Sequence, residues 1–238
     1  MIKSCLINKI VQTESVHNYL TEKGMMYTYL NPVSYLMALK EKALFGMMDG
    51  IFADGSLLAG AIRLVYGKRV TRRSFDMTSM APEVLTYANE HGMSVCVIAT
   101  RQEMLEKTIS IFSSQYPNIV WKGCRNGYFA TRMEMEEEAR KIAKSDPDYL
   151  IVGMGIKMQE RFLQMCKQAG YKGIGFTCGG FIHQTAEQEG KVDYYPTWVD
   201  KYNLRFFYRM YKEPHTRKRY AIAAFAFPYR FLKERIFG

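Results

Sequence analysis

The sequence has few of the features that build disulfide-bonded, zinc-bound or membrane-spanning proteins. Its five cysteines are odd in number and scattered along the chain, and no two of them form a CxxC pair. A disulfide framework or a structural zinc site is therefore not expected, and this cysteine usage fits a reducing cytoplasm. No apolar run reaches the roughly 18 residues of a membrane span, and the opening residues MIKSCLINKI lack the long apolar segment of a signal peptide.

The motifs of several common enzyme classes are also missing. The chain has no HExxH, no GxxxxGKS/T and no Ser–His–Asp order, which disfavours zinc proteases, P-loop NTPases and serine hydrolases. It has no GxGxxG between a strand and a helix, so a nucleotide-dependent oxidoreductase is a remote alternative. Asp146-Pro147-Asp148 superficially matches a metal-binding DxD, but it precedes a strand and contains proline. We interpret it as a turn and expect neither a metal nor another cofactor.

The positive charge is concentrated at one end of the chain. The net charge is +10, but residues 201–238 carry ten Lys and Arg against two acidic residues, and eleven Phe and Tyr. Such a tail suits an anionic membrane surface or nucleic acid. Most of its aromatics stand beside apolar residues, as in AIAAFAF (221–227), which fits a bilayer better than base stacking. We therefore expect a membrane partner and no nucleic acid; the alternatives are a non-catalytic nucleic-acid-binding α/β module and a basic, solvated helix packed on the domain.

Short apolar runs alternate with helical patterns through most of the chain. This alternation, in 238 residues that are 48% hydrophobic, predicts an α/β fold with a mostly parallel, Rossmann-like sheet covered by helices on both faces. From Pro196 the pattern becomes helical, so we expect an α/β core at 1–195 and a basic helical appendage at 196–238. The expected strands lie at 25–30, within 48–55, and at 93–100, 119–123, 149–152 and 171–180. The expected helices lie at 13–23, 33–44, 56–66, 76–89, 101–116, 131–145 and from 156 onward.

The segment 146–160 is the strongest candidate for a ligand site. After the apolar run at 149–152, Gly153 and Gly155 allow a tight turn into a helix. A strand that runs through glycines into a helix presents free N–H groups and the positive end of the helix dipole, which α/β proteins use to bind phosphate. Gln159 and Glu160 in the first helical turn are expected to face the same pocket. Two glycines alone favour an ordinary tight βα turn, and Gln159 and Glu160 shift the interpretation toward a ligand site.

Other polar residues follow the remaining predicted strands, where ligands of parallel sheets bind. Only Asp54 is a carboxylate directly between a strand and a helix; its spacing favours a helix cap, and the alternative is a general base for a hydroxyl. His183 is the only histidine in a candidate loop, and a structural role is the favoured interpretation. The remaining candidates are Asn31, Gly55, Thr100, Arg101, Arg125, Asn126, Gly127, Tyr128 and residues 179–184.

Five stretches resemble, in order, the WecG/TagA/CpsF family, glycosyltransferase family 26. They are ADG (53–55), QYPNIVWKGCRNGYF (115–129), PDYLIVGMGIKMQE (147–160), GGFIHQTA (179–186) and LRFFYRMYKEP…RY (204–220), and the resemblance extends from about Tyr27 to Tyr220. It implies an inverting, metal-independent enzyme of bacterial surface polysaccharide assembly (capsule, exopolysaccharide or cell wall). Its donor would be a UDP-sugar carrying N-acetylmannosamine or another hexose, and its acceptor a sugar on polyprenyl diphosphate at the inner face of the cell membrane.

The same resemblance implies roles for individual residues. It makes Asp54 the catalytic base, places Asn31 in the active site and sets Gln159 beside the donor. With the loop residues, the expected donor site comprises Gly55, Thr100, Arg125, Gly127, Tyr128, Gly153, Gly155, Gln159 and Glu160. Arg209 and Arg219, with Arg217 in place of a third arginine, are expected to hold the acceptor diphosphate.

The chain also departs from the family pattern. Lys157 stands at a usual proline, Tyr29 at a threonine, His183 at a frequent aspartate and Thr216 at the middle tail arginine. These departures leave the donor sugar open, and the sequence also leaves a homo-oligomer open.

Overall fold

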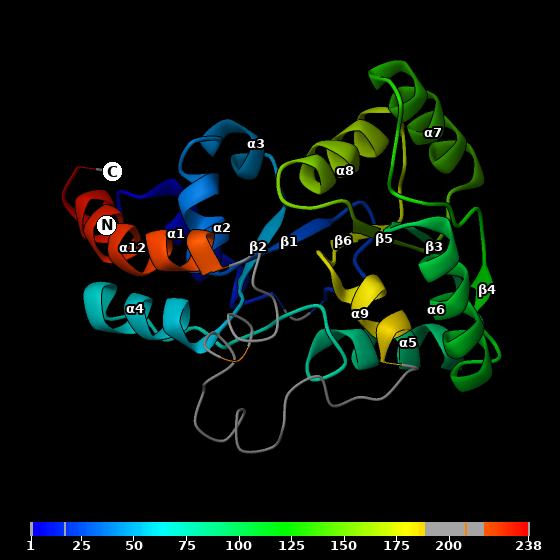
Figure 1. Cartoon of the computed structure of the whole chain (residues 1–238), viewed down its shortest axis with the longest axis horizontal. Coiled ribbons are helices and arrows are strands. Elements are labelled where there is room, and N and C mark those ends of the chain that lie inside the picture. Colours follow the sequence, from blue (N-terminus) through cyan, green and yellow to red (C-terminus); the bar gives the residue numbers. More distant parts are fainter. Residues whose placement is uncertain (1, 17, 189–207, 209–216, 238) are drawn as a thin grey trace.

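Six parallel strands form one sheet through the middle of the described part of the molecule (Figure 1). The computed structural model describes residues 2–16, 18–188, 208 and 217–237. The strand order is β2-β1-β6-β5-β3-β4, so the last strand in the sequence lies between β1 and β5. The strands are β1 (Met26–Leu30), β2 (Gly50–Ala53), β3 (Ser94–Ala99), β4 (Val120–Trp121), β5 (Tyr149–Gly153) and β6 (Ile174–Thr177). The predicted parallel α/β fold is confirmed.

Alternate residues of the central strands enter two separate cores, as the period of a strand requires. On β5, Leu150 and Val152 join one hydrophobic cluster, while Tyr149 and Ile151 join the other. All five residues of β5 and all six of β3 are buried, which explains why these strands are continuous apolar runs in the sequence.

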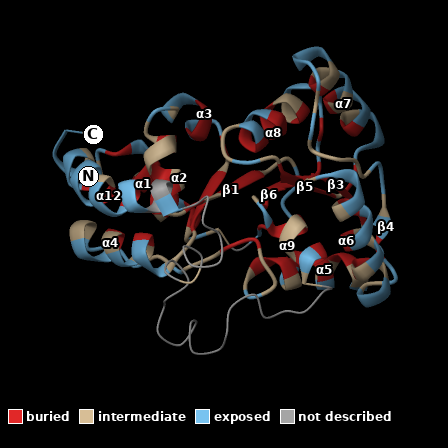
Figure 2. Ribbon diagram, in the orientation of Figure 1, coloured by how far each residue is buried: buried red, intermediate tan, exposed pale blue. Residues whose placement is uncertain are grey.

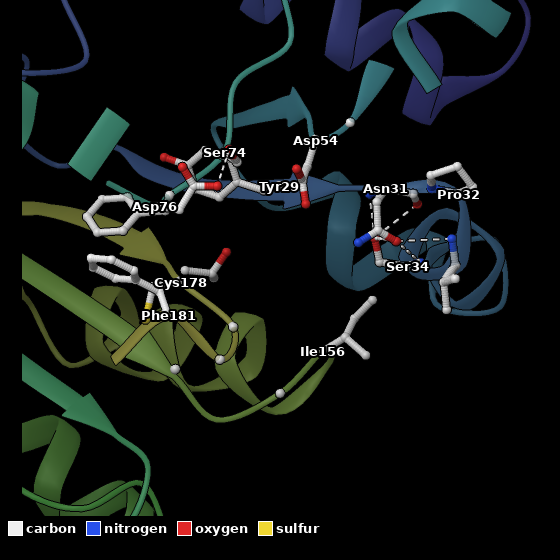
Figure 3. A pocket seen from close by; sticks show the side chains of 18 of the residues that line it. Tyr29, Asn31, Pro32, Ser34, Asp54, Ser74, Asp76, Ile156, Cys178 and Phe181 are labelled. Atoms are coloured by element: carbon white, nitrogen blue, oxygen red, sulfur yellow. Dashed lines mark hydrogen bonds between the residues drawn. The ribbon is translucent and has the colours of Figure 1, made fainter. Parts of the chain in front are cut away.

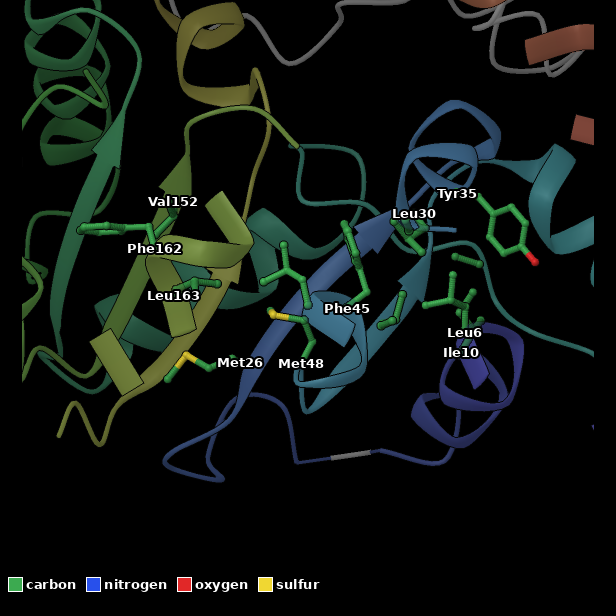
Figure 4. Close-up of a cluster of buried hydrophobic side chains, with 14 of the residues drawn as sticks. Leu6, Ile10, Met26, Leu30, Tyr35, Phe45, Met48, Val152, Phe162 and Leu163 are labelled. Atoms are coloured by element: carbon green, nitrogen blue, oxygen red, sulfur yellow. The ribbon is translucent and has the colours of Figure 1, made fainter. Parts of the chain in front are cut away.

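Helices cover both faces of the sheet (Figure 2). Helices α3, α7 and α8 contribute to the first cluster, of which Figure 4 shows part, and α5, α6 and α9 contribute to the second. The helices are α1 (Cys5–Thr13), α2 (Pro32–Ala38), α3 (Lys42–Gly46), α4 (Ser56–Tyr66), α5 (Met80–Glu90), α6 (Gln102–Gln115), α7 (Arg132–Ser145), α8 (Met158–Gln168), α9 (Phe181–Glu187) and α12 (Arg217–Phe237).

Three local predictions are wrong. The first helix is α1 rather than 13–23, because Leu6, Ile7 and Ile10 supply a buried apolar face and the chain turns after Thr13. The helix expected over 33–44 is divided into α2 and α3 by a turn at residues 39–41. The helix expected at 76–89 begins only after Ser79, as α5, and the carboxylate of Asp76 accepts hydrogen bonds from Ser74 and Thr78 ahead of it.

The C-terminal helix α12 packs against α2 and α4. Phe227 and Phe231 are buried against Tyr35, and Phe231 also meets the ring of Tyr66. Neither α12 nor any other helix in the described ranges combines the length and apolar character that crossing a bilayer requires. The start of the predicted appendage, including Arg209, lies outside the described residues.

Candidate active site

A cavity of about 1760 Å³ opens where the strands end at their carboxyl edge. Pockets for one small ligand usually measure about 300–1,000 Å³, so this cavity has room for two substrates. The loops after β1, β2, β3, β5 and β6 all reach it. The predicted site residues in its wall are Asn31, Asp54, Gly55, Thr100, Arg101, Gly127, Tyr128, Gly153, Gly155, Gln159 and, from the segment 179–184, Gly179, Gly180, Phe181, His183 and Gln184.

Asp54 and Asn31 come from the ends of the neighbouring strands β2 and β1 and face the same space, with Ile156 across it (Figure 3). Gly55, rather than Asp54, is the N-cap of α4. The φ of Gly55 is 93°, which glycine adopts without strain. Asn31 is the N-cap of α2: its Oδ1 accepts hydrogen bonds from the backbone N–H groups of Val33 and Ser34, both at 3.0 Å. This capping orients the amide and leaves Nδ2 as the group that can donate to a substrate.

The glycine turn at 153–155 packs closely against the loop after β6. A Cβ atom at Gly153 would lie 2.6 Å from the carbonyl oxygen of Gly179 and 2.8 Å from Sγ of Cys178, so only glycine fits there. Gly155 has a φ of 77°, which also favours glycine. The turn leads into α8, and the positive end of that helix dipole suits an anionic ligand.

Gln159 lines the cavity, whereas Glu160 does not. Successive residues of an α-helix point about 100° apart, so the expectation that both side chains face one pocket is wrong for Glu160. The Glu160 carboxylate is fully buried and accepts hydrogen bonds from Thr28, Gln159 and the backbone of Lys157. Burial raises its pKa, and the hydrogen bonds from Gln159 and Thr28 partly oppose that rise.

Arg125 also stays out of the cavity wall. Its guanidinium donates to the carbonyl oxygen of Tyr128 at 3.0 Å, pairs with Glu134 at 3.1 Å and lies 4.2 Å from the ring centre of Phe129. These contacts hold the loop that brings Gly127 and Tyr128 to the cavity. Arg125 therefore supports that loop. It does not line the cavity, as its predicted place in the donor site would require.

Thr100 and His183 lie together in the cavity wall. Thr100 has a φ of 43°, which is uncommon for a residue other than glycine. Its Oγ1 lies 3.1 Å from Nδ1 of His183, and Nε2 of His183 lies 3.2 Å from a carboxylate oxygen of Glu187. His183 therefore has a protein partner at each ring nitrogen and also lines the cavity.

The basic loop at 68–75 also contributes to the cavity, although it is not among the residues predicted from the sequence. Arg72 forms a β-bridge with Ala53, which brings it beside the end of β2 and into the cavity wall. Its guanidinium donates to Oγ of Ser74 at 2.9 Å and lies 3.5 Å from the Asp76 carboxylate. Burial raises the pKa of Asp76, but hydrogen bonds from Thr78 and Ser74 and the charge of Arg72 outweigh burial, so the pKa is below its ordinary value. The run of four cations at Lys68–Arg73 was the available signal.

Away from the sheet, the cavity continues between α4 and α12. The walls of this apolar slot are Leu57, Gly60, Ala61 and Leu64 from α4, and Ala223, Ala224, Phe227, Pro228, Phe231 and Leu232 from α12. Of the three tail arginines, Arg217 begins α12, the side chain of Arg219 is not described, and Arg209 lies outside the described residues. The described part of the tail thus supplies the apolar wall of the cavity.

The carboxylates of the DxD sequence have structural partners at the opposite edge of the sheet. Asp146 accepts from the backbone N–H of Lys172, and Asp148 accepts from the backbone N–H and hydroxyl of Ser94. These bonds agree with the interpretation of Asp146-Pro147-Asp148 as a turn.

The chain resembles known glycosyltransferases over nearly its whole length. The family model described as "Glycosyl transferase WecG/TagA/CpsF family" matches residues 6–238. A UDP-Gal:alpha-D-GlcNAc-diphosphoundecaprenol beta-1,4-galactosyltransferase from Shigella boydii is 30% identical over 231 residues, which cover 96% of this chain and 95% of that protein. An N-acetylglucosaminyldiphosphoundecaprenol N-acetyl-beta-D-mannosaminyltransferase from Bacillus subtilis is 25% identical, over 88% of this chain and 87% of that protein.

Proposed function

The chain belongs to the WecG/TagA/CpsF family of glycosyltransferases, and we propose that it transfers a hexose from a UDP-sugar to a sugar carried on polyprenyl diphosphate. The observation that carries this proposal is one cavity that joins Asp54, the glycine turn before α8 and an apolar slot. These three parts match a base, a donor diphosphate site and a site for a lipid-linked acceptor. The names of the two relatives, which act on diphosphoundecaprenol-linked sugars, support the same substrate classes. The products would be UDP and a lipid-linked disaccharide, an intermediate in the assembly of a bacterial surface polysaccharide.

The donor diphosphate would lie at the glycine turn. The backbone at 153–156 lines the cavity, and the helix dipole of α8 adds positive charge there. Arg72 also lines the cavity as a cation, and Asp76 offsets part of its charge. Such fixed dipoles and cations stabilise the charge that develops on a leaving diphosphate, and we infer that the transfer proceeds by these groups without a metal.

Asp54 would act as general base toward the acceptor hydroxyl. The carboxylate takes the hydroxyl proton while the oxygen attacks the anomeric carbon from the side opposite the leaving UDP, which inverts that centre. Common UDP-hexoses carry α-linked sugars, and both relatives are named as forming β linkages, which supports inversion. A positioned general base typically contributes about 10²–10⁴-fold to the rate.

The apolar slot between α4 and α12 would receive the first part of the polyprenyl chain. Exposed apolar side chains lie along both helices, including Leu57, Leu64, Phe225 and Leu232. Residues 201–238 add the charge of ten Lys and Arg against two acids, and each cation near an anionic leaflet contributes about 1 kcal/mol. We infer that the protein attaches peripherally to the inner face of the cell membrane through this surface.

Mass spectrometry of a transfer reaction tests the proposal. The protein is incubated with a panel of UDP-hexoses, including UDP-galactose and UDP-N-acetylmannosamine, and a short-chain lipid-diphosphate-linked sugar; one donor should add one sugar to the acceptor. Asp54→Asn should lower kcat by about 10²–10⁴-fold while UDP still binds. Asp148→Asn, a carboxylate change at the opposite edge of the sheet, is the matched control and should leave kcat unchanged. Parental turnover by Asp54→Asn would exclude the proposed base.

A further inference from the structure

A chain of buried hydrogen bonds lies directly behind the cavity wall, among β1, β6 and α8. Thr28 on β1 donates to Oε1 of Glu160 at 2.7 Å, and its hydroxyl lies 2.9 Å from that of Thr177 on β6. Nε2 of Gln159 donates to the same Oε1 at 3.0 Å, and the backbone N–H of Lys157 donates to Oε2 at 2.6 Å. The Glu160 side chain has no exposed surface, so it acts on a substrate only through its neighbours.

The network determines the orientation of the Gln159 carboxamide. Its nitrogen faces Glu160, and its Oε1 accepts from the backbone N–H of Gly179 at 3.2 Å. A reversed carboxamide would set its NH₂ against the N–H of Gly179 and its oxygen against the carboxylate of Glu160. The amide therefore has one stable orientation, in which the second N–H of Nε2 is the group it can offer to a ligand in the cavity.

Glu160 also holds the backbone at the start of α8. Lys157 has a φ of 73° and is not glycine, so its conformation is strained. Its N–H is bound by the carboxylate of Glu160, three residues later, at 2.6 Å. One buried carboxylate thus stabilises both the end of the glycine turn and the amide beside it.

We propose that Glu160 is a positioning residue of the donor site: it orients Gln159 so that Nε2 donates to an oxygen of the donor diphosphate. This inference rests on the proposed function and adds to it a residue that makes no contact with substrate. The bond from Gln159 strengthens as negative charge develops on the leaving group, so its loss lowers kcat more than it raises KM.

Glu160→Gln is the informative substitution, because a carboxamide cannot satisfy all the donors around it. If the NH₂ of residue 160 takes the place of Oε2, it opposes the backbone N–H of Lys157, which cannot turn away. If the NH₂ takes the place of Oε1, it opposes Nε2 of Gln159, and a reversed Gln159 carboxamide would then oppose the N–H of Gly179. Thr28 alone can adapt, since its hydroxyl rotates.

A double-mutant cycle with lipid-linked acceptor and UDP-sugar tests the inference. Glu160→Gln and Gln159→Ala should each lower kcat by about 10²-fold, the effect of one lost transition-state donor, with a smaller change in KM. If Glu160 acts through Gln159, the double variant should also lose about 10²-fold, whereas independent roles would multiply to about 10⁴-fold. A multiplicative loss, or parental kcat in Glu160→Gln, overturns the positioning role.

Further variants separate positioning from folding. Thr28→Val removes one hydrogen-bond donor to Oε1 of Glu160 and should lower kcat several-fold. Thr28→Ser keeps the hydroxyl and should keep the parental kcat. Gln164→Leu changes another buried polar side chain of α8, which bonds to the carbonyl oxygen of Met47, and should lower the melting temperature without lowering kcat. Calorimetric titration with UDP distinguishes the failures: a parent chain that neither binds UDP nor transfers sugar overturns the proposed function, whereas a parent that does both, alongside a fully active Glu160→Gln, overturns only the role of Glu160.

Discussion

Two phenylalanines on α12 separate the contribution of this helix to stability from its contribution to membrane binding. Phe231 is 1% exposed, whereas Phe225, on the same helix, is 85% exposed. The ring of Phe231 lies 5.1 Å from that of Phe227 and 5.5 Å from those of Tyr35 and Tyr66. The same substitution, Phe to Ala, therefore removes a core contact at one position and a solvent-exposed ring at the other.

The expected magnitudes differ widely. Truncating a buried phenylalanine to alanine costs about 3–5 kcal/mol, because transfer energy is lost and a cavity remains. In a chain of 150–250 residues each kcal/mol shifts the melting temperature by about 2–4 °C, so Phe231→Ala should lower it by on the order of 10 °C. Phe225→Ala should change stability by less than about 0.5 kcal/mol, as surface substitutions usually do.

Thermal melting and vesicle sedimentation together make the assay. Phe231→Ala should melt at a lower temperature, and trypsin should cleave α12 faster in this variant, because the helix opens locally from α2 and α4. Phe225→Ala should keep the parental melting temperature and sediment less with vesicles that contain anionic lipid. Equal melting temperatures for the two variants would refute the assignment of α12 to the core, and parental sedimentation of Phe225→Ala would refute membrane contact at that position.

Three further predictions concern single residues. Burial raises the pKa of Asp148, but hydrogen bonds to its carboxylate outweigh burial and lower the pKa. The stability that this carboxylate contributes is present above its unfolded pKa of about 4 and is lost at more acidic pH. Asp148→Asn should therefore flatten the acid side of a plot of the free energy of unfolding, measured by urea denaturation, against pH. Lys157→Gly should raise the free energy of unfolding by about 1 kcal/mol by relieving a φ of 73°, whereas Lys157→Ala, which keeps the strain, should not. Gly153→Ala should abolish transfer because its Cβ would lie 2.6 Å from the carbonyl oxygen of Gly179; Gly46→Ala, with no atom within 4 Å of the added carbon, is the control and should remain active.

The strands and their carboxyl-edge loops could be predicted from the sequence because local chemistry determines them. Buried parallel strands must be apolar throughout, and glycines must stand where the backbone turns tightly or another loop approaches, as at Gly153. Asn31 followed by proline is a local capping signal, and the structure uses it as one. That Asp54 and Gln159 line the same cavity then follows from strands that run parallel.

The rest of the candidate site depends on contacts between distant segments. Arg72 reaches the cavity only through its bridge to Ala53, and no local pattern distinguishes it from the other cations of its loop. Glu160 is a different case: helix geometry alone separates it from Gln159, so its burial was predictable and the pocket-facing interpretation was avoidable. The first helix lies before the segment expected at 13–23 because Leu6, Ile7 and Ile10 give α1 the apolar face that packs into the core.

The strand order has a consequence for synthesis. Since β6 is inserted between β1 and β5, the sheet before its arrival consists of two unconnected pieces, β2-β1 and β5-β3-β4. Asp54 belongs to the first piece and the glycine turn to the second. A ribosome must therefore release the chain beyond Thr177 before the two halves of the candidate site can meet. Until then each piece presents an unpaired strand edge that nascent-chain chaperones have reason to shield.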